Sequence, residues 1–201
     1  MSKIYTKKGD DGTTYTGKPK RELKSSSTSM LLGTIDELHV CLGKCCTYAS
    51  KEETKQLMSC LAAICLDIGS IIYFINSENN KEANTMLTNK FINLSHNMEI
   101  IIDEKNKTLE PLTEFIVFAN CTEEGITLHE ARATTRRLER MFTAYIRTIN
   151  DPPESIKYLR QYLNRLSDLL FTLARVNNGN GIPRSKTDEM LGYLFMKPLL
   201  V

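Results

Sequence analysis

Arginines and a histidine crowd into one short segment of the chain, LHEARATTRRLER at 128–140. Arg132, Arg136 and Glu139 follow one another at i, i+4 and i+7, so a helix built here carries them on one face. A surface helix normally turns an apolar stripe toward its neighbour. Arginines in part of that stripe indicate a polyanion or buried carboxylates as the partner. The alternative is a solvated charged face, and this segment alone favours neither.

A second candidate segment lies near the N-terminus, where residues 5–17 read YTKKGDDGTTYTG. Glycines let backbone N–H groups approach an anion and lysines neutralise it, so these are the ingredients of a phosphate cradle. No GxxxxGK[ST] pattern is present, which excludes a Walker A loop. Composition alone favours a disordered terminus over a cradle.

Two further groups of polar residues interrupt apolar segments. Asp36 and Glu37, in GTIDEL at 33–38, are expected in the first turn of a helix. There they either complement the helix dipole or form an ion pair with an arginine of 128–140. Asn164 and Asp168 lie at i and i+4 in a leucine-rich helix. They either fix the register between packed helices or contact a ligand. The three histidines lack metal-ligand spacing, and each is expected to be satisfied or exposed: His39, His96 and His129.

Composition sets the broad class of the protein. A chain of 201 residues with 41% hydrophobic residues can build one domain with a full core. A net charge of only +2 does not indicate a nucleic-acid binder, and the apolar run 68–75 is too short to span a bilayer. The six cysteines form no CxxC, which favours buried free thiols over a metal cluster or disulfides. We expect a cytoplasmic protein without a membrane anchor, or a mitochondrial one if a presequence precedes this chain.

Apolar residues at helical spacing predict an all-α, five-helix bundle in a single domain. Residues 1–29 are expected to form an arm, 30–178 the bundle, and 179–201 a tail that folds back or reaches a neighbouring subunit. Ser50 is the expected N-cap of the second helix. A short extended run is expected at 115–118. The predicted helices are 30–50, 51–77, 84–106, 123–149 and 154–177.

In this order and spacing the motifs resemble the PduO-type ATP:corrinoid (cob(I)alamin) adenosyltransferase family over residues 4–178. Departures from the family pattern are Lys8 in place of a threonine, the loop 118–121 in place of Pro-Gly-Gly, and the serine-rich 25–29. Because residues 15–24 align loosely, Lys24 could exchange roles with Lys20 or Arg21. The resemblance is carried by YTKxGDxGxT at 5–14, GTIDEL at 33–38, LEPLxxFI at 109–116, HxARxxxRRxER at 129–140 and YLNRLSD at 162–168.

The resemblance implies a homotrimer with three composite sites at the subunit interfaces. Asp36 would pair with Arg132 across the interface, and Phe115 would bind the corrin and displace its lower axial base. Arg136 and Phe115 would be the catalytic residues. The ATP-binding residues would be Thr6, Lys7, Lys8, Gly9, Thr13, Thr14 and Lys24 of one arm, with Arg136, Arg137, Glu139, Arg140 and Asn164 of the neighbouring subunit.

The implied reaction transfers the 5′-deoxyadenosyl group of ATP to the cobalt of cob(I)alamin, giving adenosylcobalamin and triphosphate. No protein metal site is expected, because Mg²⁺ would be bound through the ATP phosphates. A flavoprotein reductase and an adenosylcobalamin-dependent client enzyme are the implied protein partners, and nucleic acid is not. The alternative functions are a non-catalytic trimer that binds and delivers cobalamin and a structural helical bundle.

Overall fold

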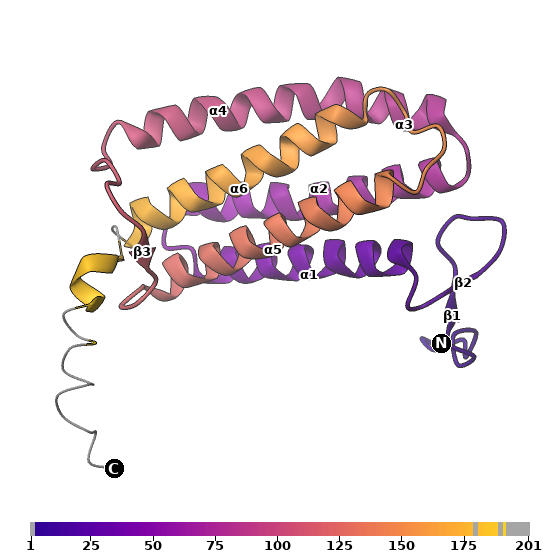
Figure 1. The fold of residues 1–201 in the computed structure, drawn as a ribbon, viewed down its shortest axis with the longest axis horizontal. Helices are drawn as coiled ribbons and strands as arrows, with labels where there is room; N and C mark the ends of the chain where they lie inside the picture. Colours follow the sequence, from indigo (N-terminus) through magenta and orange to yellow (C-terminus); the bar gives the residue numbers. More distant parts are fainter. Residues whose placement is uncertain (1–2, 179–180, 189–190, 192–201) are drawn as a thin grey trace, which may run out of the picture.

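A computed structural model shows a bundle of long helices, and it describes residues 3–178, 181–188 and 191. The helices run along a common long axis, with short strand pairs at both ends of the bundle (Figure 1). The predicted five-helix bundle is confirmed, with the third predicted helix divided into α3, η1 and α4. The elements are β1 (Thr13–Thr14), β2 (Glu22–Leu23), α1 (Ser27–Tyr48), α2 (Glu52–Asn76), α3 (Asn80–Met86), the π-helical η1 (Leu87–Phe91), α4 (Ile92–Asn106), β3 (Ile116–Val117), α5 (Glu123–Ile146), α6 (Ile156–Asn178) and β4 (Ile182–Pro183).

The core lies where α5 packs between α1 and α6, with α2 behind α1 and α4 behind α6. Leucines of α1 and α6 and isoleucines of α2, each recurring at helical spacing, are almost completely buried there. By length and composition α2 would also pass as a membrane span, but 50% of that window is buried inside the bundle. A core helix passes the same test, so the apolar face of α2 is explained by packing. All six cysteines are free, although only Cys45 and Cys65 are buried.

Several helix ends differ from the prediction because local capping groups decide them. α1 begins at Ser27 rather than Met30, since the Ser26 side chain accepts a 3.2 Å hydrogen bond from the Ser29 N–H. Ser50 is not the cap of α2. Its N–H instead donates a 3.1 Å hydrogen bond to the buried Glu124 carboxylate, and Lys51 takes the cap position without a side-chain bond.

The remaining differences concern the connections. The segment expected to be a loop at 76–85 contains α3, capped by Asn79, and the chain continues to α4 through one π-helical turn. α5 ends at Ile146 and α6 begins at Ile156, so the Pro-containing connection is longer than predicted. The tail folds back as expected over 181–188, where β4 pairs antiparallel with β3. The rest of the predicted tail, 189–190 and 192–201, lies outside the described residues.

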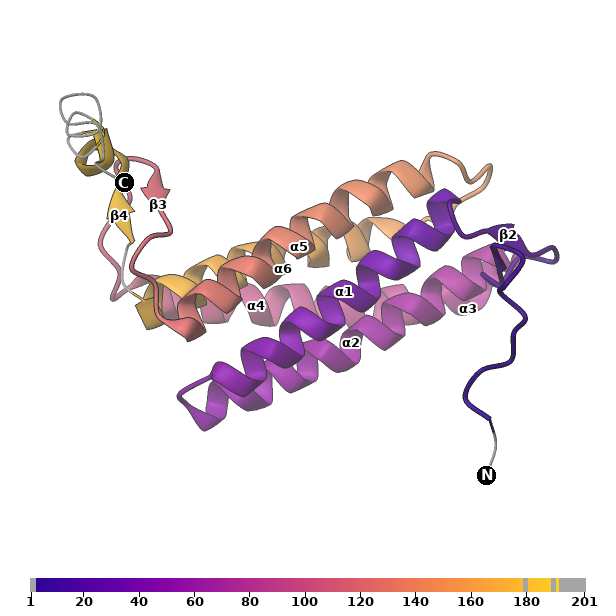
Figure 2. The same cartoon turned by 90° about the horizontal axis from the view of Figure 1, so that it is seen from below.

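The two short sheets lie at opposite ends of the bundle. The β1–β2 hairpin of the arm lies beside the start of α1, and the β3–β4 pair lies beside the start of α5 (Figures 1 and 2). Both segments that carry the predicted chemistry outside the helices are therefore ordered. They are also far apart within one chain.

Candidate functional site

Residues 7–26 of the arm form a hydrogen-bonded hairpin, so the alternative of a disordered terminus does not hold for them. β1 pairs with β2, and Thr13 is opposite Leu23. Arg21 ties the turn together, donating a 2.8 Å hydrogen bond to the Thr13 hydroxyl and a 2.5 Å bond to the Lys8 carbonyl. The Asp11 carboxylate accepts from the Thr13 N–H, and this bond lowers the pKa of Asp11. The arm thus has a defined backbone before any ligand arrives.

Within this hairpin the Lys24 ammonium lies beside Gly9, while the Arg21 guanidinium is bonded to the neighbouring Lys8 carbonyl. A Cβ added to Gly9 would lie 3.1 Å from the Lys24 Nζ and 3.4 Å from the Thr13 carbonyl oxygen. Arg21 is occupied with the backbone, which removes one alternative for the role of Lys24. The other predicted arm residues, Thr6, Lys7, Lys8 and Thr14, lie along the same turn. The three N-terminal ones are exposed and Thr14 is half-buried.

The arginine face of α5 has two like charges close together. Burial and then the charge of Arg136 lower the pKa of Arg132. The Arg132 Nε is buried and has no hydrogen-bond partner among the described residues. Its guanidinium lies 5.3 Å from the Phe118 ring centre and 5.8 Å from that of Phe171. A small cavity of about 180 Å³ opens here, lined by both arginines, Ser167, Asp168 and Phe171. This arrangement favours an anion that approaches from outside the chain.

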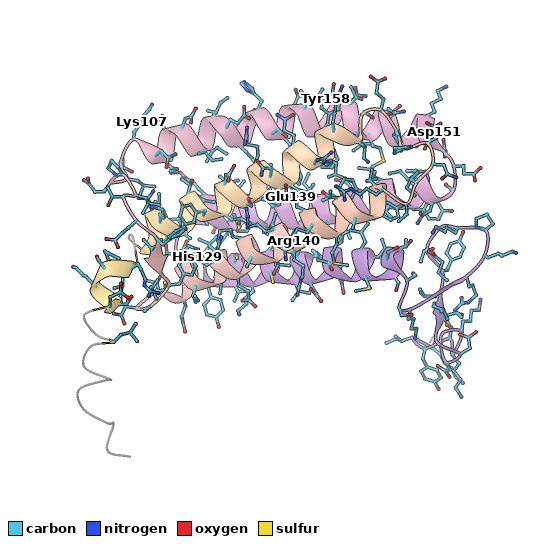
Figure 3. The ribbon with its side chains drawn as sticks, in the orientation of Figure 1. Lys107, His129, Glu139, Arg140, Asp151 and Tyr158 are labelled. Carbon is cyan, nitrogen blue, oxygen red and sulfur yellow. The ribbon has the colours of Figure 1, made fainter. Side chains whose placement is uncertain are left out.

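The other residues of the arginine segment are spread around the helix. Glu139 and Arg140 lie near the middle of α5 (Figure 3), the first half-buried and the second exposed. Neither Arg136 nor Arg140 makes an ion pair within the part of the chain that the structure describes. Arg137 does, because its guanidinium binds the Glu37 carboxylate of α1. Both partners are about half exposed, so this pair contributes little stability.

A larger, mostly apolar cavity of about 730 Å³ opens at the β3 end, and we call it the aromatic cavity because Phe115, Phe118 and Phe171 line it. The Phe115 ring lies at its rim with 89% of its surface exposed. The loop that carries it is held by the folded-back tail. The Arg184 N–H donates to the Phe115 carbonyl at 2.9 Å, and the Ser185 N–H donates to the Glu114 carboxylate at 2.8 Å. The lining residues are Leu112, Thr113, Glu114, Phe115, Ile116, Phe118, Arg132, Phe171 and Arg184.

Phe118 and Phe171 of this cavity form a cluster of tilted rings with His129, which the sequence did not predict. The rings of Phe118 and His129 are 3.9 Å apart, and Phe171 lies 6.0 Å from His129. His129 is buried, and its Nδ1 has no hydrogen-bond partner in the part of the chain that the structure describes, so the expectation of a satisfied or exposed histidine was wrong. Burial and the charge of Arg132 lower its pKa to about 4, and it is neutral at pH 7. Phe171 follows Asp168 at i+3, a spacing that could have placed it beside the polar pair.

Two predicted residues lie apart from these cavities. Asn164 is half-buried on α6, and its side-chain oxygen accepts a 3.2 Å hydrogen bond from Arg165, which itself pairs with Glu99 of α4 at 2.7 Å. Asp36 is exposed on α1, and no ion pair joins it to Arg132 within the described residues. Within one chain, Glu37 is the α1 carboxylate that forms an ion pair with an α5 arginine, Arg137. The Asp36–Arg132 pair remains a prediction about the subunit interface.

Comparisons with known proteins agree on one family. A family model for cobalamin adenosyltransferase matches residues 4–177. A corrinoid adenosyltransferase of Citrobacter freundii is 32% identical over 88% of this chain and 95% of that protein. The corrinoid adenosyltransferase MMAB of Homo sapiens is 32% identical over 87% of this chain and 68% of that protein.

A solved structure shows the same fold. It is a variant PduO-type ATP:corrinoid adenosyltransferase from Lactobacillus reuteri, complexed with cobalamin and ATP. It matches with a TM-score of 0.67 at 23% identity, covering 90% of this chain and 97% of that one.

Proposed function

This chain belongs to the cobalamin adenosyltransferase family, and we propose that it carries out adenosyl transfer with two sets of its own residues. Its function is ATP:corrinoid adenosyltransfer. Cobalt(I) attacks the C5′ carbon of the ATP ribose, a cobalt–carbon bond forms, and the bond from C5′ to the triphosphate oxygen breaks. The observation that carries the assignment of residues is the Arg132–Arg136 face, which makes no ion pair among the described residues and adjoins the aromatic cavity.

The arginine face supports a role in stabilising the leaving group. Triphosphate departs with its full negative charge, and no proton transfer is needed at the reacting carbon. Arg136 is exposed, is free of ion pairs within the described chain, and lines a small cavity together with the half-buried Arg132. Fixed cations in such a place stabilise charge that develops in the transition state. Arg140 and the arm residues Lys24, Lys7 and Lys8 would extend this cationic surface along the triphosphate.

The aromatic cavity supports a role on the corrin side. A cobalt that keeps its lower axial ligand is difficult to reduce, and axial ligation is a main lever of a protein on such a metal centre. Phe115 projects a bare ring at the cavity rim, and Phe118 and Phe171 continue the apolar surface behind it. An aromatic wall against the lower face of the corrin would exclude both the nucleotide base and water. Reduction of cob(II)alamin then becomes easier.

The two sets of residues imply a site shared between subunits. Within one chain the arm hairpin and the Phe115 loop lie at opposite ends of the bundle (Figures 1 and 2), so one chain does not bring its own arm to its own cavity. We infer that the arm of one subunit binds ATP against the arginine face of a neighbour, in a homotrimer. The exposed Asp36 on α1 and the unpartnered Arg132 Nε on α5 support an intersubunit ion pair.

Mg²⁺ is expected to arrive with the nucleotide. Protein-bound Mg²⁺ usually has one or two carboxylate ligands together with substrate phosphates and water. The described residues contain no group of three His, Cys, Asp or Glu side chains placed around one point. They do offer the half-buried carboxylate of Glu139 on the arginine face, and such a donor suits an ion carried by the triphosphate. Its chemistry there would be to neutralise the phosphate oxygens.

The direct test is a turnover spectrum. Chemically reduced cob(I)alamin is mixed with the purified protein, and its absorbance is followed before and after ATP is added. We expect conversion to the spectrum of adenosylcobalamin with one triphosphate released per corrinoid. A protein that binds both compounds but leaves the cob(I)alamin spectrum unchanged would be a delivery protein instead.

A further inference from the structure

The arm is buried against the bundle at a single point. Of residues 3–25, only Thr16 and Gly17 are buried. The Asn76 side-chain amide donates a 2.5 Å hydrogen bond to the Thr16 carbonyl oxygen, and the Tyr145 hydroxyl donates a 2.6 Å bond to the Asn76 side-chain oxygen. Asn76 ends α2 and Tyr145 lies in the last turn of α5. Two core helices thus hold the arm through one chain of hydrogen bonds.

The second half of this contact is the close approach of Gly17 to α2. Gly17 has a φ of +93°, and a Cβ placed on it would lie 2.9 Å from a ring carbon of Tyr73 and 3.1 Å from its carbonyl oxygen. Only glycine accepts both the left-handed backbone and this distance. The backbone of the arm therefore lies directly on the last turns of α2.

The anchor is linked to the residues assigned to ATP. The Thr16 hydroxyl donates a 2.5 Å hydrogen bond to Glu22, and Lys18 pairs with the same carboxylate at 2.8 Å. Glu22 is in β2, which pairs with β1 and leads to Lys24. Fixing Thr16 therefore fixes the hairpin that carries Thr13, Thr14 and Lys24. Asn76 and Tyr145 themselves line neither the arginine face nor the aromatic cavity.

We propose that Asn76 and Tyr145 are positioning residues that hold the arm in its ATP-binding conformation. This rests on the proposed function, in which the arm binds ATP. Asn76 is 5% exposed and Tyr145 is fully buried, so neither side chain can exchange its partner for water without opening the contact. With little other burial to hold the arm, loss of this link lowers the fraction of molecules with a docked arm. The apparent ATP affinity falls by that same fraction.

The test compares Asn76→Leu and Tyr145→Phe with Tyr162→Phe in the full chain. Tyr162 is an equally buried tyrosine that packs against Phe91 in the middle of the bundle. We expect Asn76→Leu to raise the KM for ATP about tenfold or more. Tyr145→Phe should raise it less, and Tyr162→Phe should not change it. The KM for cob(I)alamin and kcat at saturating ATP should stay within about twofold in all three.

Hydrogen exchange of the ligand-free protein gives a readout that does not depend on activity. In Asn76→Leu and Tyr145→Phe, amides of residues 12–24 should exchange faster, while those of the core helices should not change. A folded Asn76→Leu protein with wild-type ATP KM and wild-type arm exchange would overturn the proposal. If Asn76→Leu does not fold, unchanged arm exchange in Tyr145→Phe overturns it. If the wild-type protein fails to bind ATP, the proposed function is wrong. Hydrogen exchange of the arm amides then tests by itself whether Asn76 and Tyr145 hold the arm.

Discussion

At the scale of single residues, Arg136 is the side chain on which the proposed transfer most depends. We predict that Arg136→Ala lowers turnover by about 10²–10³, equivalent to about 3–4 kcal/mol of barrier, because a cation beside the departing triphosphate is lost. The matched control is Arg160→Ala, which removes an exposed arginine of α6 that lines neither cavity. Steady-state rates with ATP and cob(I)alamin measure both. Turnover within about threefold of wild type would show that Arg136 has another role.

Phe115 is expected to separate the two halves of the reaction. Phe115→Ala should leave ATP binding near normal, because the ring lines the aromatic cavity and not the smaller cavity that Arg136 lines. Reduction of cob(II)alamin should become harder, because water or the lower ligand can return to cobalt. Optical and paramagnetic spectra with bound ATP report the four-coordinate species. If it is undiminished, Phe118→Ala is the next variant, since that ring lines the same cavity.

His129 predicts a pH dependence of stability. Burial and the Arg132 charge lower its pKa to about 4, against about 6.5 in an unfolded chain. Between these two pH values the unfolded chain binds more protons at His129 than the folded chain does. The stabilising contribution of neutral His129 to the free energy of unfolding is therefore complete above about pH 6.5 and is lost as the pH falls toward about 4. His129→Phe should remove about 2–3 kcal/mol of the decline in unfolding free energy between about pH 7 and about pH 4.5.

Urea unfolding of wild type and variant at the two pH values measures this difference. His96→Phe is the control, since the His96 side chain is 71% exposed and should leave the decline unchanged. An identical decline in wild type and His129→Phe would mean that His129 titrates normally in the folded protein.

At the scale of elements, the arm and the bundle are expected to be separable. Of the described residues 3–24, only Thr16 and Gly17 at the anchor are buried, so deletion of residues 1–24 should leave the helical circular dichroism and cooperative unfolding in place. It should abolish ATP binding, because the glycine turn and Lys24 are removed together. Calorimetric titration with ATP compares the truncated and full chains. Unchanged affinity would assign ATP to the helices alone.

At the scale of the whole molecule, the proposed trimer depends on Asp36 and Arg132. We predict that Asp36→Asn weakens assembly and activity together, since an interfacial Arg132 left without its partner costs about 3–5 kcal/mol. Glu37→Gln is the matched control one residue away, because Glu37 pairs with Arg137 within its own chain. Analytical ultracentrifugation should show dissociation for Asp36→Asn and for Arg132→Ala, but not for Glu37→Gln. An intact Asp36→Asn trimer of normal thermal stability would argue against the pair.

The sequence predicted features that depend on residues close together in the chain, and it missed those that depend on contacts between distant segments. Helical spacing predicted the bundle, because residues such as Leu31, Leu38 and Leu42 must share a face before any partner is known. It misplaced the start of α2, because Ser50 bonds Glu124, a residue distant in sequence, instead of capping its own helix. The π-helical turn at 87–91 left no mark in the spacing either.

The candidate site divides in the same way. By residue type and order the sequence itself determined the family, the arginine face and the glycine-rich arm, since these are local patterns of charge and backbone freedom. Only the tertiary structure decided that Lys24 lies beside Gly9, that Phe171 and His129 support the cavity, and that Glu37 pairs with Arg137. Only it showed the arm held by Asn76 and Tyr145 at the opposite end from Phe115. The physical reason is that each of these contacts joins side chains from separate segments, whose proximity is set by how the helices pack.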